Sequence, residues 1–317
     1  MLRSEHAVEL QESESPHAIG WRIQRLDVHM RDRTDNPGSV MDILADILGR
    51  LPNLRVLTFS ITGHGYDGSY EYLPERVLRA TNACRDTLRL LNWYSGVRPS
   101  SYTWASFLEN HPRLEAINAP VSLSRLENSH IVLDSLKSIF VHPPESHIQD
   151  MDMLWYVNLP SICHAICEIT PTASTSFHKD FLRKILPKLT SIQINFLSLD
   201  WVFHEPMSSI VGACKNLTRV DFITFTWLIP FLSIPKSVQT LGIRVIAHQI
   251  PRRSLEAFFS SIRDLLSCSS SVKTLCFTDQ RNVRALRAHP QALSSNLAGI
   301  LILGVNVMDH GGCPLVV

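Results

Sequence analysis

Apolar residues recur along this chain in a fixed order. An apolar residue is followed by two other positions, a second apolar residue, one other position and a third apolar residue, as in Leu54, Leu57 and Phe59. Positions two apart share one face of a β-strand, so we expect the second and third residues to point into a core. The first residue, called the anchor, would close the turn before the strand. The anchors are Ile23, Leu54, Leu88, Leu114, Leu136, Ile162, Leu189, Leu217, Val238, Val272 and Leu297.

The stretches between these short strands have the spacing of helices. The clearest apolar runs with a period near 3.6 residues lie at 40–51 (after Ser39 as a cap), 177–186, 207–214 and 255–266. Strands that alternate with helices indicate parallel strands joined by crossover connections. Cys84, Cys214 and Cys268 each end a helical stretch just before an anchor, so we interpret them as small core residues.

The spacing of the anchors indicates a repeat protein. Their mean separation is about 27 residues, and single steps range from 21 residues, between Leu217 and Val238, to 34. One such strand cannot bury its apolar face alone, so neighbouring repeats must stack into a solenoid.

Composition narrows the class of function. The chain has 317 residues, 45% hydrophobic and 19% charged, with a formal net charge of +1. This balance predicts a folded protein with no nucleic-acid partner, which would need a basic surface. Seven cysteines do not indicate a disulfide framework, and the longest apolar run, 297–307, is too short to span a membrane. We therefore expect a cytoplasmic or nuclear protein without a membrane partner.

The motifs LPNLRVLTFSITG, CRDTLRLLNWYSG and HPRLEAINAP resemble the repeats of leucine-rich-repeat proteins of the ribonuclease-inhibitor-like class, and in particular those of fungal F-box proteins. The resemblance covers about residues 20–308. It implies an α/β fold, an irregular leucine-rich-repeat solenoid (a horseshoe or arc) with a concave parallel sheet and helices on the convex side. We expect a flexible polar N-terminus at 1–18, a solenoid of about 10–11 repeats at 19–308 and a C-terminal tail at 309–317.

In the F-box family, an N-terminal F-box binds the Skp adaptor of a ubiquitin ligase and the repeats hold the substrate. Residues 1–18 are too short and polar for an F-box, so we expect adaptor binding only through an F-box outside this chain. The fragment LPERVL at 73–78 is similar to the start of an F-box. It lies between two repeat strands, however, and Pro74 suits the first position of a repeat helix.

Other candidate chemistry has simpler structural explanations. Residues 63–68, GHGYDG, match a dinucleotide-binding pattern, but no helix opens directly after the third glycine. Cys163, His164 and Cys167 have a tolerable spacing for zinc, but no second ligand pair follows, and alternation would point His164 and Cys167 to opposite faces. We predict no enzymatic activity, no cofactor and no metal site.

The predicted binding surface follows from strand alternation. Residues between and just after the core positions line the concave face, where solenoids commonly bind their partners. The predicted partner contacts on this face are Leu90, Asn92, Tyr94, Phe140, His142, Gln193, Asn195, Arg219, Asp221 and Arg244. A secondary contact is expected in the loop that contains Tyr66, Tyr70 and Tyr72.

These observations lead to two hypotheses. The first is a non-enzymatic module for protein recognition, as in the substrate-recognition part of an F-box-type ubiquitin ligase receptor. The alternative is a stand-alone leucine-rich-repeat scaffold or inhibitor unrelated to ubiquitination. Both predict that Leu57, Leu217 and Leu241 are buried.

Overall fold

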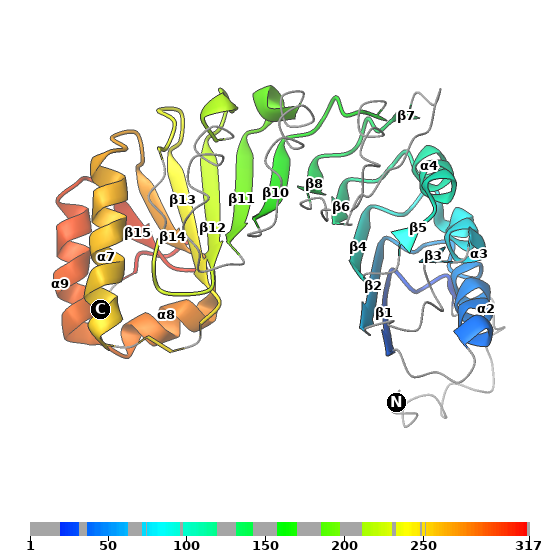
Figure 1. The fold of residues 1–317 in the computed structure, drawn as a ribbon, viewed down its shortest axis with the longest axis horizontal. Coiled ribbons are helices and arrows are strands. Elements are labelled where there is room, and N and C mark those ends of the chain that lie inside the picture. The colour runs from blue at the N-terminus through cyan, green and yellow to red at the C-terminus, as the bar shows by residue number, and fades with distance from the viewer. Residues whose placement is uncertain are drawn as a thin grey trace. The chain divides into compact units, whose positions relative to one another are not determined.

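The computed structural model describes residues 20–31, 37–62, 72–73, 75–95, 98–118, 131–141, 157–169, 185–196, 211–229, 233–247, 249–250 and 252–315. The chain divides into two compact units, residues 1–137 with 149–161 and residues 138–148 with 162–317. Each unit contains parallel strands and helices (Figure 1).

Among its described residues, the first unit has four parallel strands of the large sheet, in the order in which they occur along the chain. They are β1 (Arg25–Arg31), β2 (Val56–Thr62), β4 (Leu90–Ser95) and β6 (Ala116–Asn118). Its helices are α2 (Pro37–Leu48), α3 (Glu75–Ala80), the 3₁₀ turn η2 (Thr81–Cys84) and α4 (Ser101–Asn110), and they lie to one side of the strands (Figure 1). Two short parallel pairs complete the described part, β3 (Tyr72–Leu73) with β5 (Arg98–Pro99) and β7 (Ile131–Val132) with β9 (Val157–Asn158).

The described residues of the second unit form seven parallel strands, which also lie in the order in which they occur along the chain. They are β8 (Ser138–Val141), β10 (His164–Ile169), β11 (Ser191–Phe196), β12 (Arg219–Thr224), β13 (Thr240–Val245), β14 (Thr274–Phe277) and β15 (Asn306–Met308). Its helical elements are η4 (Leu186–Lys188), α7 (Arg252–Ser267), α8 (Gln280–Arg287) and α9 (Pro290–Leu301).

The turn before most strands is the same, and it is built from main-chain hydrogen bonds. The amide of Leu54 donates to the carbonyl of Leu51, and the amide of Leu217 donates to that of Cys214. The residue after the anchor then joins two repeats, because the Arg55 carbonyl accepts from the amides of both Arg89 and Leu90. Equivalent carbonyls, each with two amide donors, are Gln24, Arg89, Cys163, Thr190, Thr218 and Gln239. These recurrent bonds support a repeat architecture.

The core lies where the apolar pattern predicts it. The nine anchors from Leu54 to Val272 are at most 2% exposed, and Leu57, Leu217 and Leu241 are completely buried. Aromatic rings extend the core to the helices: Trp93 on β4 meets Trp104 on α4, and Trp227 meets Phe258 on α7. Ile23, at the first strand, is only half-buried.

The prediction for the last repeat is wrong. The sequence pattern predicts Leu297 as the anchor, with Ile300 and Ile302 on the strand after it. Instead, Leu297 and Ile300 lie on α9 with their side chains buried against the core, and Ile302 follows the helix. Gly304 takes the anchor position, because its amide makes the recurrent turn bond to the Leu301 carbonyl. A glycine suits this position, since its φ of 74° lies in the left-handed region that side chains disfavour.

Two smaller expectations also need correction. Cys268 is exposed, and the small residue buried three positions before the Val272 anchor is Ser269. The first predicted helix begins at Pro37, two residues before the expected Ser39 cap, which agrees with the preference of proline for the first turn. The helix predicted at 255–266 is confirmed by α7.

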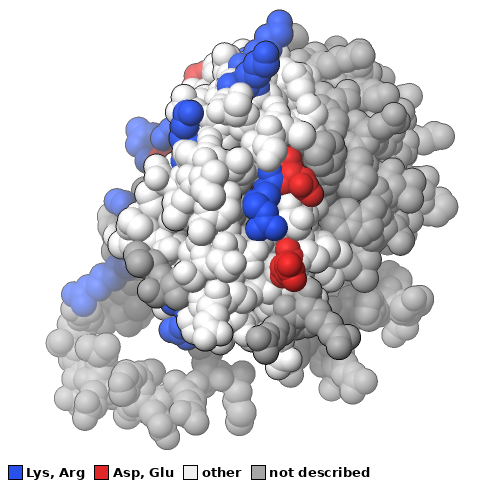
Figure 2. Space-filling model, turned by 90° about the vertical axis from the view of Figure 1, so that its left-hand side faces the viewer, with Lys and Arg blue, Asp and Glu red and all other residues white. Residues whose placement is uncertain are grey.

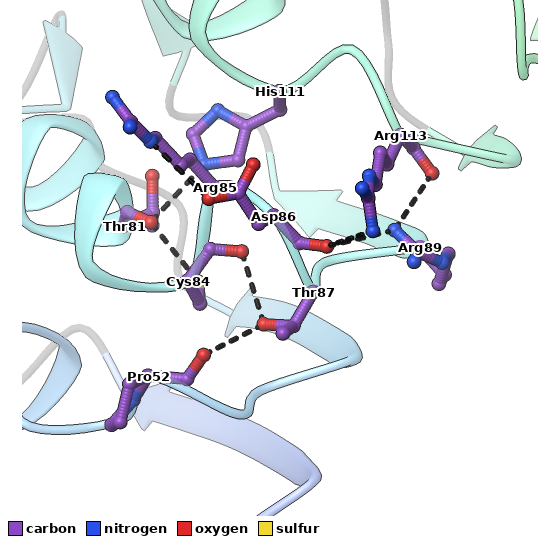
Figure 3. A network of polar contacts seen from close by, with 9 residues as sticks. All are labelled: Pro52, Thr81, Cys84, Arg85, Asp86, Thr87, Arg89, His111 and Arg113. Atoms are coloured by element: carbon purple, nitrogen blue, oxygen red, sulfur yellow. Dashed lines mark hydrogen bonds and ion pairs between the residues drawn. The ribbon is translucent and has the colours of Figure 1, made fainter.

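Polar contacts join adjacent repeats of the first unit (Figure 3). The Thr87 hydroxyl oxygen lies 2.8, 3.0 and 3.1 Å from the carbonyl oxygens of Pro52, Leu54 and Cys84, which share its single proton as acceptors. Arg89 Nη1 donates to the Arg113 carbonyl at 3.3 Å. These bonds link the turns before β2, β4 and β6.

His111 is fully buried beside this network (Figure 3). Its Nδ1 lies 2.7 Å from the Phe107 carbonyl oxygen, and its Nε2 lies 3.1 Å from the Thr81 carbonyl oxygen. Both ring nitrogens therefore face acceptors, although a neutral imidazole carries one N–H. Burial is the main cause that lowers the pKa of His111.

Candidate functional site

The candidate site is the open face, which we define as the side of the strands opposite the buried core residues. Strand register places its residues in rows that cross the strands. In the first unit one row contains Asp27, Thr58, Asn92 and Asn118. In the second unit one row runs His164, Ser191, Arg219, Thr240 and Thr274, and the next contains Gln193, Asp221 and Gly242.

Hydrogen bonds join the polar row of the first unit. Asn118 Nδ2 donates to Asn92 Oδ1 at 2.8 Å, and Asn92 Nδ2 donates to Thr58 Oγ1 at 3.3 Å. Arg25, which donates to Asp27 at 2.8 Å, is the main cause that lowers the pKa of Asp27, and a hydrogen bond from Thr58 acts in the same direction. The negative charge of Asp27 thus fixes the direction of all the donors in the row.

The row ends at an acceptor that receives no hydrogen bond from the described part of the chain. Asn118 Oδ1 is buried and has no hydrogen-bond partner among the described residues. A buried polar atom in this state costs free energy. A donor supplied by a binding partner would remove that cost.

The second unit carries charged groups on its open face. Arg219 Nε and Nη2 donate to Asp221 Oδ2 and Oδ1, both at 2.8 Å, so the pair is bidentate. The Arg244 and Asp279 side chains form a second ion pair at 3.1 Å. The bidentate geometry of the Arg219–Asp221 pair holds both of its side chains in a fixed orientation.

Gly242 makes room for the Arg219–Asp221 pair. A Cβ atom at residue 242 would lie 1.7 Å from Asp221 Oδ1. The carboxylate therefore occupies the space that a side chain on the neighbouring strand β13 would fill. Only glycine allows Asp221 to lie in this position.

Neutral polar groups adjoin the ion pair. His164 Nδ1 lies 2.6 Å from Ser191 Oγ, and Gln193 Nε2 donates to Asn195 Oδ1 at 2.8 Å. Burial is the main cause that lowers the pKa of His164, while the Asp221 charge acts in the opposite direction. This part of the open face therefore combines an imidazole, a hydroxyl group and side-chain amides with the Arg219–Asp221 ion pair.

The structure locates most of the predicted contact residues. Leu90, Asn92, Phe140, Gln193, Asn195, Arg219 and Asp221 lie half-buried on strands, and Arg244 is exposed. Tyr94 lies on β4 and Tyr72 on β3, but their side chains are outside the described part. His142, Tyr66 and Tyr70 lie outside the described residues. The binding role of all these residues stays a prediction.

Some residues of the open face were not among the predicted contacts. Asp27, Thr58 and Asn118 complete the row of Asn92, and His164 with Ser191 extends the row of Arg219. Strand alternation placed Thr58 and His164 on the outward side, so a signal for both existed in the sequence.

The three buried cysteines are poor nucleophiles. Burial raises the pKa of the Cys84 thiol to about 11 and the pKa values of the Cys167 and Cys214 thiols to about 12. Reactive cysteines need the thiolate form. Within the described ranges, no group of three or more His, Cys, Asp or Glu residues could hold a metal ion, and no helix is long and apolar enough to cross a membrane.

Comparisons with known proteins give a limited result. No protein-family model and no curated protein matches the chain. One similar solved structure is that of a Bacteroides fragilis protein from a structural genomics consortium, with 11% sequence identity and a TM-score of 0.45. The match covers 90% of this chain and 74% of the other.

Proposed function

We propose that this chain is a leucine-rich-repeat module that binds another protein through the open face, without catalysing a reaction. The observation that carries the proposal is the Arg219–Asp221 pair over Gly242, in which a glycine gives space to a fixed charged group on the open face. Arginine in a fixed orientation is typical of residues that contribute most to protein interfaces.

The resemblance to fungal F-box proteins specifies the partner further. On that basis, we propose that the bound protein is a substrate for ubiquitination and that the chain works as a substrate-recognition part. A stand-alone scaffold or inhibitor would use the same face, so the composition of the complex separates the two functions. Skp adaptor and cullin in the complex would support the first function, and their absence would favour the second.

The test is capture of partners from the native source by the chain and its variants. Arg219→Ala should weaken capture, with circular dichroism unchanged, because half-buried Arg219 lies outside the apolar core. The matched control is Arg79→Ala. Arg79 also forms an ion pair, with Glu75, but it lies exposed on helix α3.

Further variants make the test decisive. Tyr94→Ala, alone and together with Arg219→Ala, extends it to the predicted aromatic contact on β4. If the double variant folds and still captures every partner, the open face is not the binding surface. If Arg79→Ala weakens capture as much as Arg219→Ala, the effect is not specific to that face.

A further inference from the structure

The last repeat differs from the rest of the chain in charge. Residues 288–317 contain no Lys, Arg or Glu and a single Asp, whereas 19% of the whole chain is charged. That residue, Asp309, is buried, lies 3.6 Å from Arg287 and accepts hydrogen bonds from the amides of Gly311 and Cys313. The last repeat therefore offers a surface almost without charge.

The last repeat is also apolar where other repeats are polar. In the nine turns before the anchors from Leu54 to Val272, proline or a polar residue occupies each of the two positions that precede the anchor. The corresponding residues before Gly304 are Ile302 and Leu303, which are 85% and 42% exposed. Leu301 is 55% exposed, although the equivalent Leu51 and Leu186 are each 3% exposed.

No further parallel strand can cover these residues by pairing with β15. The segment after β15 turns back, with an antiparallel bridge between Met308 and Pro314. The Leu315 amide donates to the Val307 carbonyl at 2.8 Å. Because this segment occupies the edge of β15, a strand of a partner cannot extend the sheet there, and the exposed side of helix α9 is left for contact.

Helix α9 presents a continuous uncharged face. Leu293, Leu297 and Ile300 pack into the core. The opposite side, which we name the terminal face, follows helical spacing and consists of Gln291, Ser294, Ser295, Ala298, Leu301, Ile302 and Leu303. Figure 2 looks onto this end of the second unit, and most of its described surface is neither Lys or Arg nor Asp or Glu.

We propose that the terminal face binds the terminal face of a second copy of this chain, with the two α9 helices antiparallel across a two-fold axis near Ala298. A two-fold contact places the same patch against itself. On a charged surface such a contact brings like charges together, whereas the residues of the terminal face carry no charge. The guanidinium of Arg263 on α7 lies at the edge of this face, where its Nη1 donates to Asn296 Oδ1 at 2.9 Å. Ser294, Ser295 and Ala298 are small enough to let the helices approach closely, so that Leu301 and Ile302 lose their contact with water.

The opposite end of the array is a poorer match for this face. β1 exposes Arg25 and Asp27, which would be desolvated against an apolar surface at a free-energy cost. The proposal is therefore a closed dimer and not head-to-tail growth. It is independent of the proposed function of the open face, because α9 lies on the opposite side of the strands.

Sedimentation of the full chain over a range of concentrations tests the proposal. The 35.8 kDa chain should approach twice that mass and no more. Ala298→Lys places two like charges near the axis, and Ile302→Lys puts a charge in the apolar part. Each should weaken dimerisation by about tenfold or more, while Ile43→Lys, at an isoleucine 55% exposed on α2, should leave it unchanged.

A charge-swap experiment excludes a general loss of folding. Ala298→Lys and Ala298→Asp should each be monomeric alone and should form a mixed dimer when combined. A wild-type chain that stays monomeric would overturn the proposal, as would growth beyond the dimer. A dimer that persists in both Ala298→Lys and Ile302→Lys would also overturn it.

Discussion

The two units are built from the same kind of repeat, but their polar side chains find different hydrogen-bond partners. In the first, neutral donors pass from Asn118 through Asn92 and Thr58 toward the charge of Asp27. In the second, Arg219 and Asp221 satisfy each other on one strand. The backbone is similar in both, so the side chains of the open face decide what each unit can bind.

The helix sides of the two units differ as well. In the first unit, α4 and its C-terminal cap bury polar groups, with His111 between two carbonyls and Trp104 Nε1 without a hydrogen-bond partner among the described residues. In the second, α7 packs Phe258 and Phe259 against Phe277 of β14. The first unit should therefore respond more to polar substitutions and to pH, and the second more to loss of apolar volume.

The largest expected effect comes from truncating the core. Leu217→Ala in the second unit and Leu57→Ala in the first should each reduce the free energy of unfolding by about 2–5 kcal/mol, because both side chains are completely buried. Hydrogen exchange should show the greatest loss of protection in the unit that carries the substitution, since each repeat contacts only its neighbours. Equal loss in both units would contradict the division.

The next largest loss of stability should come from adding a side chain at Gly242. Gly242→Ala should displace the Asp221 carboxylate and reduce stability by about 1–3 kcal/mol, as measured by denaturant unfolding. In an Asp221→Ala background the same substitution should cost much less, because the obstructing oxygen is gone. A cost that does not depend on Asp221 would show that Gly242 is needed for its backbone and not for space.

The polar row of the first unit should give a smaller effect. Asn92→Ala leaves Asn118 Nδ2 without its acceptor, and the expected cost is about 1 kcal/mol. Gln193→Ala, which removes one half-buried bond in the second unit, is the comparison. If the two substitutions reduce the free energy of unfolding by the same amount, the polar row provides no cooperative stabilisation.

The smallest effect should be a pH dependence of stability. Burial lowers the pKa of His111 in the folded state below the ordinary value of 6.5, so the unfolded state binds the proton more readily. The stability contributed by neutral His111 is present above about pH 6.5 and is lost as pH falls from there toward the folded pKa.

Two variants assign this pH dependence to a unit. In the wild-type chain, the first unit should lose hydrogen-exchange protection when the pH falls from neutral to mildly acidic. In His111→Gln this loss should be smaller. His164→Gln should do the same in the second unit, because burial lowers the pKa of His164 as well. An unchanged pH slope in His111→Gln would exclude the buried imidazole as its source.

Short-range patterns in the sequence predicted much of the fold. The strand residues follow a period of two, and most anchors occupy a turn with the same main-chain bond, so both could be found without three-dimensional information. The last repeat could not, because the spacing of Leu297 and Ile300 fits the buried face of α9 as well as an anchor followed by a strand residue. Gly304 gives no apolar signal at the anchor position.

The candidate site could be predicted only in outline. Alternation places Asn92, Gln193 and Arg219 on the same side of their strands, but it does not specify hydrogen-bond partners. The fit of Asp221 over Gly242 depends on the register between β12 and β13, and the direction of donors toward Asp27 depends on three strand pairings. Those relations are set by tertiary packing.

The carbonyl that accepts two amides at seven of the described turns has an evolutionary consequence. Because the connection between repeats is made by the main chain, it does not depend on which side chain follows the anchor; Arg, Cys, Thr and Gln all occur there. A gene duplication or deletion that removes or adds one whole repeat would rejoin compatible ends. Relatives of this chain can thus differ in repeat number and in the length between turns, while selection alters the open face one strand at a time.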